Sequence, residues 1–284
     1  MDETKVMAGA AVDLHMHTRV SDGRWTPETL VARVAELGIG VMAIADHDAL
    51  DSVVPGRALA AARGITLVSG VEVTTRWDGR QWHLLVYGAD PEHGQLHDLV
   101  ARQRQRHIDR ANEAIARARQ RGYELPALDE IIGGRPPLPI YVMNAVIRAG
   151  YATSHLTANQ FVANTLGVPF YIDVPIQEAV AAAHASHALA IVAHPGRRED
   201  PDPMTAERLP RLLAETPIDG LEAYYPTHTP EQVAAYAALA ERYDLLCSCG
   251  SDSHGPDWPR DPIAYPVDRA APLLARLGVT TSVR

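Results

Sequence analysis

The sequence predicts an α/β protein in which a mostly parallel sheet forms an incomplete barrel. Short β-branched runs alternate with Ala-rich helical stretches along most of the chain, as expected for parallel strands joined by helices. Seven strands can be distinguished, fewer than an eightfold barrel requires. The 284 residues, 46% of them apolar and 21% charged, suffice for one α/β barrel of about 250 residues with an insertion.

The predicted strands are the apolar, β-branched runs at 10–17, 41–46, 65–75, 81–87, 188–194, 219–224 and 245–250. The third and fourth form a hairpin, because Asp78 and Gly79 stand at the centre of the turn between them. A helix follows the first strand between Thr26 and Gly38, and another follows the second strand and ends at Gly64. Further helices are predicted at about 176–187, 205–215 and 230–243.

Residues 91–172 interrupt the alternation of strands and helices. They begin with a long helix at about 95–121 and contain a Gly/Pro-rich hinge at 133–139. This pattern predicts a helical insertion, a cap over the mouth of a barrel formed by 1–90 and 173–284. The insertion carries nine Arg and seven acidic residues, which is a net charge of +2. Because the whole chain carries −9, the remaining residues carry −11. Its Arg-rich helix is either a solvated face or a positive lid over an anionic substrate.

Composition narrows the class of protein. A net charge of −9 argues against bulk binding to nucleic acid or to an anionic membrane. The first apolar run, at 6–12, is too short for a signal peptide or a membrane span, so we expect a cytoplasmic protein with no membrane partner and no obligatory protein partner. The two cysteines, Cys247 and Cys249, are predicted to be small core residues.

Histidines and carboxylates gather at the predicted strands or directly after them. The candidate metal ligands are His15, His17, Asp22, His47, Glu72, His83, His194, Asp252 and His254. In an α/β barrel the strand ends surround one mouth, where catalytic groups meet. Histidine and carboxylate ligands without thiolates suit Mn²⁺, Zn²⁺ or Fe²⁺, and nine candidates exceed the needs of one ion, which indicates two or three metals.

Each of these residues also has a structural alternative. A single histidine on a strand is often an ordinary core or surface residue, and Asp46 or Asp48 would serve as a cap of the following helix. Glu72 is harder to explain this way, because an unpaired carboxylate in an apolar strand is costly to bury. The conjunction of all nine residues favours a metal centre.

These motifs resemble those of the PHP family, named for polymerase and histidinol phosphatase. The matching motifs are His15-x-His17, Asp46-His47-Asp48, Ser69-Gly70-Val71-Glu72, His83, Ala193-His194-Pro195 and Gly250-Ser251-Asp252-x-His254-Gly255. The resemblance covers 12–90 and 175–260. It implies a distorted (β/α)₇ barrel related to the amidohydrolases, a trinuclear metal centre and phosphoesterase activity.

The resemblance also implies a ligand set for each metal. One ion would be held by His15, His17, Glu72 and Asp252. Glu72 would bridge to a second ion with His83 and His194, and the third would be held by Asp22, His47 and His254. The expected cofactor is three Mn²⁺, with Zn²⁺, Fe²⁺ or Mg²⁺ as alternatives.

The order of barrel, insertion and barrel most resembles a bacterial branch of the family. Its members remove the 3′-phosphate from nucleoside 3′,5′-bisphosphates, and relatives in the branch trim short RNA from the 5′ end. That branch usually reads Gly-Arg-Pro-His in the insertion, whereas here Pro137 follows Gly134-Arg135-Pro136. Arg135, Arg148 and Arg197 are the candidates for binding a second phosphate, since a guanidinium matches phosphate bidentately.

We therefore expect a metal-dependent phosphatase that converts nucleoside 3′,5′-bisphosphates to the 5′-monophosphate and phosphate. A hydroxide that bridges the metals would attack phosphorus, with Asp22 and His254 as the catalytic residues. Three alternatives stay open: a 5′–3′ exoribonuclease on short 5′-phosphorylated RNA, a phosphomonoesterase similar to histidinol phosphatase, and a metal-binding module without activity.

Overall fold

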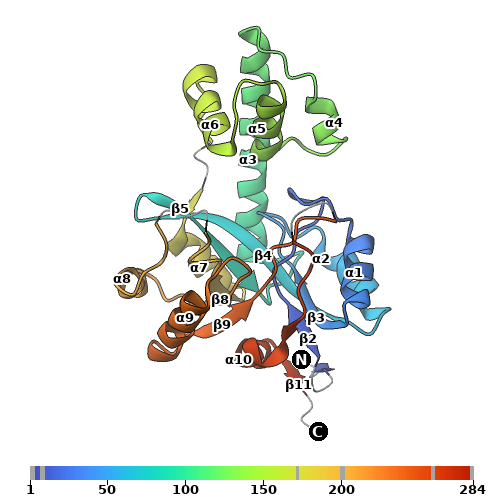
Figure 1. Ribbon diagram of the computed structural model, residues 1–284, viewed down its shortest axis with the longest axis vertical. Coiled ribbons are helices and arrows are strands. Elements are labelled where there is room, and N and C mark those ends of the chain that lie inside the picture. The colour runs from blue at the N-terminus through green and yellow to red at the C-terminus, as the bar shows by residue number, and fades with distance from the viewer. Residues whose placement is uncertain (1–3, 7–9, 171–172, 199–201, 257–259, 282–284) are drawn as a thin grey trace. The chain divides into compact units, whose positions relative to one another are not determined.

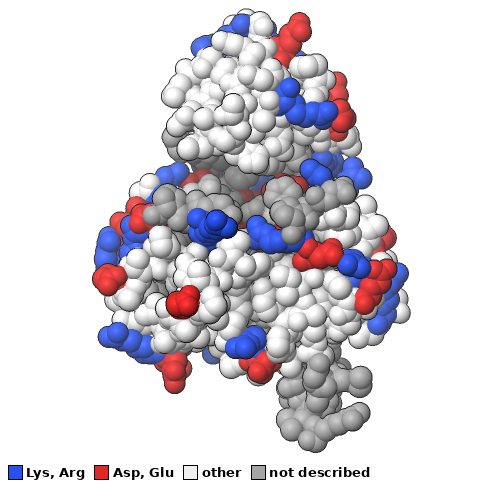
Figure 2. All heavy atoms as spheres, viewed as in Figure 1, with Lys and Arg blue, Asp and Glu red and all other residues white. Residues whose placement is uncertain are grey.

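The computed structural model describes residues 4–6, 10–170, 173–198, 202–256 and 260–281 (Figure 1). The chain divides into two compact units. One is formed by Met1–Val100 together with Val174–Arg284 and contains the sheets, and the other is formed by Ala101–Asp173. None of the described helices is both long and apolar enough to cross a membrane. Figure 2 shows acidic and basic side chains interspersed over the face that it presents.

The first unit is built around a nearly closed, barrel-shaped sheet. Its strands are β2 (Ala11–Asp13), β3 (Ile39–Ile44), β4 (Thr66–Trp77), β5 (Arg80–Tyr87), β6 (Val174–Pro175), β7 (Leu189–Val192), β8 (Gly220–Tyr224), β9 (Leu246–Cys249) and β10 (Tyr265–Pro266). They run in the order β10-β2-β3-β4-β5-β7-β8-β9, and β6 pairs with β4. β5 is antiparallel to both β4 and β7, whereas the β2–β3–β4 and β7–β8–β9 pairs are parallel. The predicted α/β barrel is confirmed.

The two ends of the sheet meet just beyond β2 and β9. The amide of Leu14 donates to the carbonyl of Cys249 at 3.1 Å, and the amide of Asp252 donates to the carbonyl of His15 at 2.7 Å. Met16 and Ser253 form a parallel bridge further along. The first predicted strand, 10–17, is therefore shorter than expected as a regular strand, because after Asp13 the backbone turns its hydrogen bonds toward the segment that follows β9.

Both faces of the sheet are buried, as in other α/β proteins. Met42 and Ile44 of β3 belong to the core that includes helical residues such as Leu30, whereas Val41 and Ala43 of the same strand belong to a second core. The surrounding helices are α1 (Pro27–Glu36), α2 (Val53–Ala61), α7 (Ile176–Ala185), α8 (Arg208–Glu215), α9 (Pro230–Arg242) and α10 (Ala271–Arg276). A small parallel pair, β1 (Thr4–Val6) with β11 (Val279–Thr281), completes the unit.

The helices start where the local sequence predicts. Thr26 caps α1, with its hydroxyl accepting from the amide of Thr29 at 3.3 Å, and Pro27 occupies the first turn. Gly38 follows the helix with a φ of 70°, a left-handed conformation that favours glycine. The chain turns at Gly38 and enters β3 at the next residue.

The second unit has a core of its own. α3 (Gln95–Gln120) begins within the first unit and continues into the second, where it is followed by α4 (Leu128–Ile132), α5 (Pro139–Arg148), α6 (His155–Gln160) and a π-helical turn, η1 (Phe161–Leu166). Ala111 and Ala114 of α3 pack with Val142, Val146 and Leu166. The described residues of this unit are helical or irregular. On α3, Arg110 pairs with Glu113 at 2.8 Å, as on a solvated helix face.

Candidate metal centre

The structure brings the nine candidate ligands together in the first unit. His15 and His17 follow β2, His47 follows β3, His194 follows β7, and Asp252 and His254 follow β9, whereas Glu72 and His83 lie within β4 and β5 and Asp22 lies in the loop before α1. Three groups have ligand atoms within 4.8 Å of one another: His17, Asp22, His47 and His254; His15, His17, Glu72 and Asp252; and His47, Glu72 and His83. His194 joins the last group through Glu72.

Glu72 lies at the centre of these groups. Its Oε2 is 3.0 Å from His15 Nε2 and 3.2 Å from His17 Nε2. Its Oε1 is 2.8 Å from His83 Nδ1 and 2.9 Å from His194 Nε2. The side chain is fully buried. The two carboxylate oxygens thus face two different sets of imidazoles, which is the geometry needed to bridge two cations.

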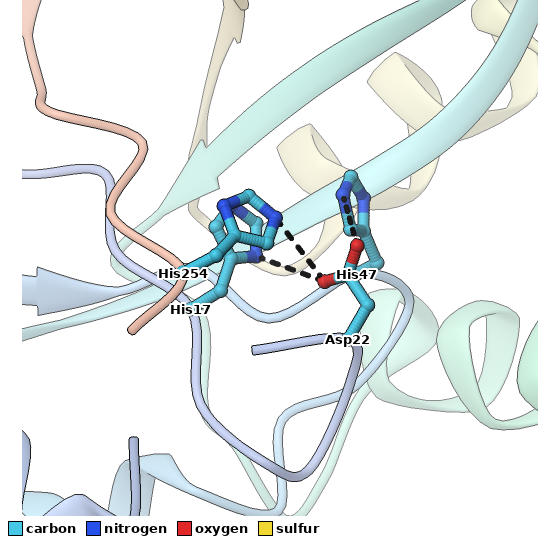
Figure 3. A group of neighbouring side chains, drawn as sticks. All are labelled: His17, Asp22, His47 and His254. Atoms are coloured by element: carbon cyan, nitrogen blue, oxygen red, sulfur yellow. Dashed lines mark ion pairs between the residues drawn. The ribbon is translucent and has the colours of Figure 1, made fainter. Parts of the chain in front are cut away.

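The remaining group surrounds Asp22, as Figure 3 shows. Asp22 Oδ1 lies 3.3 Å from His254 Nε2 and 4.0 Å from His17 Nδ1, and Oδ2 lies 3.9 Å from His47 Nε2. The rings of His17 and His254 stack with centroids 4.1 Å apart. His17 is shared with the Glu72 group, so the clusters are contiguous.

Burial and charge set the protonation of these side chains. For Glu72 and Asp252, burial disfavours the charge, but the surrounding histidines outweigh it and hold both pKa values well below the usual range. Burial opposes protonation of His17, yet Asp252 and Glu72 raise its pKa to about 10. For His47 and His194 burial outweighs the attraction of Glu72 and lowers the pKa to about 4. Buried carboxylates that stay ionised, such as those of Glu72 and Asp252, require positive charge close by.

The hydrogen bonding of the cluster fits a divalent metal. Among the described residues, both ring nitrogens of His17 and Nδ1 of His83 are buried without a hydrogen-bond partner. Carboxylate oxygens nevertheless lie 2.8–3.2 Å from His83 Nδ1 and His17 Nε2. Atoms this close that are not aligned for a hydrogen bond are positioned to share a cation. Imidazole and carboxylate donors without thiolates suit Mn²⁺, Zn²⁺ or Fe²⁺.

The backbone is strained at two of the candidate ligands. His194 has a φ of 28° and Asp252 a φ of 54°, both in the left-handed region that non-glycine residues rarely adopt. Such conformations cost about 1–3 kcal/mol each and persist where surrounding contacts fix them. Here they turn the side chains that follow β7 and β9 toward Glu72 and His17.

Three residues support the candidate ligands or the loops that carry them, and the sequence did not predict this role for any of the three. Asp46 does not cap α2; its carboxylate accepts from Thr18, Ser21 and Ser52 at 2.6–2.7 Å and so ties two ligand-bearing loops together. Tyr225 donates its hydroxyl to Asp252 Oδ2 at 2.7 Å. The third residue, Glu222, is fully buried within an apolar strand, and that local pattern, the same as for Glu72, was the available signal.

The three candidate arginines lie in different surroundings. Arg197 lines a small hollow together with Gln81, Trp82, His83, Ala193 and His194, beside one group of candidate ligands. Arg135, in the second unit, donates to the carbonyls of Ile132 and Ile131 at 2.8 and 2.7 Å. Arg148 pairs with Glu130 at 3.0 Å on the same unit. Phosphate binding by any of the three arginines stays a prediction.

A barrel that gathers buried histidines and carboxylates into contiguous ligand groups is suited to binding divalent metals. Residues 13–133 match the model of the PHP domain. The 5′–3′ exoribonuclease Rnm of Escherichia coli strain K12 is 31% identical over 86% of this chain and 85% of its own. The 3′,5′-nucleoside bisphosphate phosphatase of Chromobacterium violaceum is 30% identical over 87% and 88%.

The fold is shared with a solved structure from Bifidobacterium adolescentis that was assigned as a metal-dependent phosphoesterase. The two superpose with a TM-score of 0.76 and 25% identity, covering 95% of this chain and 98% of the other. The chain belongs to the PHP domain family, as its motifs indicate, and it is a metal-dependent phosphoesterase.

Proposed function

We propose that this enzyme removes the 3′-phosphate from nucleoside 3′,5′-bisphosphates to give the 5′-monophosphate and free phosphate. The observation that carries the proposal is the hollow in which Arg197 lies beside His83 and His194. It offers a fixed positive charge next to the ligand groups, as a substrate with two phosphates requires. Similarity to the bisphosphate phosphatase over 87% of this chain supports the same substrate.

The nine side chains would hold three divalent cations, and we propose Mn²⁺ for all three. Glu72 would bridge two of them through its two oxygens, with His15, His17 and Asp252 on one side and His83 and His194 on the other. Asp22, His47 and His254 would hold the third. When bound, such ions supply a hydroxide nucleophile at neutral pH and neutralise charge on the transferring phosphoryl group.

Asp22 and His254 are the proposed catalytic residues of the chain itself. His254 Nδ1 lies 2.9 Å from the carbonyl of Asp252, which places the ring hydrogen there and leaves Nε2 facing Asp22. Burial lowers the pKa of His254, but Asp22 reverses the effect and raises it overall. As a ligand of the third cation, Nε2 would carry no proton, so His254 and Asp22 would act on the leaving ribose oxygen by holding that cation, which would neutralise the developing charge.

The products of a bisphosphate digest test this proposal. We expect the 5′-monophosphate and inorganic phosphate, separated by chromatography, with mononucleotides as poorer substrates, because the remote phosphate positions the reacting one. Glu72→Gln, prepared in parallel, controls for a contaminating phosphatase. Accumulation of the 3′-monophosphate would mean that the two phosphate positions are reversed and would overturn the assignment.

Similarity to an exoribonuclease over 85% of that enzyme favours a second candidate. A short RNA with a 5′-phosphate would place that phosphate at Arg197 and its first 3′-phosphodiester at the ligand groups. The expected products are 5′-mononucleotides released one at a time from the 5′ end. The rate of hydrolysis of a 5′-phosphorylated oligoribonucleotide is compared with that of its 5′-hydroxyl form, which shows whether the 5′-phosphate is needed. The rate on the 5′-phosphorylated form is also compared with that on the bisphosphate at equal concentration, which ranks the two substrates.

A further inference from the structure

β8 contributes none of the nine candidate ligands, yet one of its side chains contacts two of them. Glu222 is fully buried. Its Oε1 lies 2.9 Å from His15 Nδ1, and its Oε2 accepts a hydrogen bond from the backbone amide of His194 at 2.7 Å. Both oxygens are therefore engaged, one by a side chain that follows β2 and the other by the backbone that follows β7.

The contact with His15 determines which ring nitrogen faces the ligand cluster. An ionised carboxylate only accepts hydrogen bonds, so Nδ1 of His15 carries the hydrogen. The other nitrogen, Nε2, lies 3.0 Å from Glu72 Oε2 and 3.6 Å from Asp252 Oδ1. Carboxylates that accept from the far nitrogen of a histidine fix its tautomer and orientation toward a metal. Glu222 stands in that relation to His15.

The contact with His194 acts on the backbone. His194 has a φ of 28°, and its amide is held by Glu222 while its own Nε2 reaches Glu72 Oε1 at 2.9 Å. The rings of His15 and His194 stack with centroids 5.7 Å apart. One carboxylate thus sets the positions of two imidazoles that lie on opposite oxygens of Glu72.

Gly250 packs directly against this pair. A Cβ added at Gly250 would lie 2.1 Å from His15 Cβ and 2.9 Å from Glu222 Oε1. The bare backbone of Gly250 therefore forms one wall of the pair. Real Cβ atoms do not approach this closely, so any side chain at Gly250 would displace His15.

We propose that Glu222 is a positioning residue of the metal centre, which orients His15 and His194 so that their Nε2 atoms present to cations on both sides of Glu72. The inference depends on the metal centre of the proposed function. It assigns to β8, the one strand between the ligand-bearing β7 and β9, a role in holding ligands rather than supplying them.

Glu222→Gln tests this role, with Asp219→Asn as a matched control. Asp219 directly precedes β8, where its Oδ2 contacts one imidazole, His184, and accepts from one backbone amide, Ala190, both at 2.8 Å. Neither partner is a candidate ligand. A glutamine at 222 must direct its NH₂ either at the His194 amide, where donor faces donor, or at His15 Nδ1, which would then have to accept and move its hydrogen to Nε2.

Metal binding to the chelator-treated full chain is the primary readout. For Glu222→Gln we expect Mn²⁺ affinity, measured by titration calorimetry, to fall about 10–100-fold, and the visible spectrum of the Co²⁺-loaded protein to shift. Asp219→Asn should retain both at wild-type values, and circular dichroism should show both variants folded. Wild-type Mn²⁺ affinity and Co²⁺ spectrum in Glu222→Gln, or an equal loss in Asp219→Asn, would overturn the proposal.

A second measurement uses only the wild-type protein. In the Zn²⁺-loaded form, long-range proton–nitrogen NMR correlations should show His15 protonated at Nδ1, and a hydrogen at Nε2 instead would contradict the role of Glu222. The outcomes separate the two levels of inference. A wild-type chain that binds no Mn²⁺ refutes the metal centre itself, whereas binding that is indifferent to Glu222→Gln refutes the positioning role alone.

Discussion

Replacing Glu72 by glutamine gives the sharpest prediction for the centre. The substitution keeps the size of the side chain and removes its charge. Five imidazole nitrogens lie 2.8–3.4 Å from the two carboxylate oxygens, and they belong to His15, His17, His47, His83 and His194. No orientation of an amide can satisfy donors on both of its ends, so the loss extends across the cluster.

The magnitude follows from burial. Removing one partner of a buried charged pair costs about 3–5 kcal/mol. With an unfolding entropy of about 2.1 cal/mol/K per residue, the 284-residue metal-free chain should lose about 5–8 °C in Tm. The same loss applied to the transition state corresponds to about 10²–10⁴-fold in kcat/KM. Two of the three ligand groups contain Glu72, so bound metal should fall from three ions per chain to one.

Elemental analysis, differential scanning calorimetry and phosphate release measure these three effects on one preparation. Glu36→Gln is the control, because Glu36 is exposed and pairs with Arg33 at 2.9 Å, away from the ligand groups. The control should match the wild type in every assay. A Glu72→Gln enzyme that keeps three ions and its activity within tenfold of wild type would refute the bridging geometry.

Three further variants and a metal-removal experiment extend the test. Asp22→Asn should cost one ion rather than two and lower kcat while leaving the Glu72-centred ions in place, as elemental analysis and steady-state kinetics will show. If Arg135 and Arg148 bind the second phosphate, as the sequence predicts, replacing both by Ala should lower kcat/KM for a bisphosphate and spare an aryl phosphate, because charge-assisted bonds worth about 1.5–3 kcal/mol each would be lost only by the second phosphate. Equal losses on both substrates would contradict that role. Gly250→Ala should destabilise the chain by about 1–3 kcal/mol through overpacking against His15, measured by urea denaturation. Treatment with a chelator should abolish phosphate release, and added Mn²⁺ should restore it.

The sequence alone predicted most of the barrel because its signals are local. Turn chemistry at Asp78-Gly79 placed the hairpin between β4 and β5, and the cap at Thr26 placed α1 within a residue of its observed start. These signals act over a few residues, where side chains and backbone determine each other directly. The edge strands β10 and β11 span only two and three residues and were missed, because so short a segment has no periodicity.

Most of the candidate ligands were predictable for the same reason, since they follow or interrupt an apolar run, whereas Asp22 lies in the polar loop before α1. The residues that support the ligands were not predictable. Glu222 and His15 are 207 residues apart in the chain, and Tyr225 reaches Asp252 across 27 residues. Such pairs are set by how the barrel closes, which no local pattern encodes. The partners of Arg135, two carbonyls at the end of α4, likewise follow from the left-handed turn at Gly133 rather than from residue type.

The barrel closes between the segments that follow β2 and β9, so it can close only after nearly the whole chain has been synthesised. Ser251 and His15, which meet at this seam, are 236 residues apart. A ribosome that adds about 5–20 residues per second needs about 12–47 s to make the chain between them. Until then His15 and His17 lack Asp252 and the strand that closes the ring. The complete ligand set is therefore available only late in biosynthesis, and a chain that terminates before β9 retains Glu72 but lacks the strand that closes the ring and two candidate ligands, Asp252 and His254.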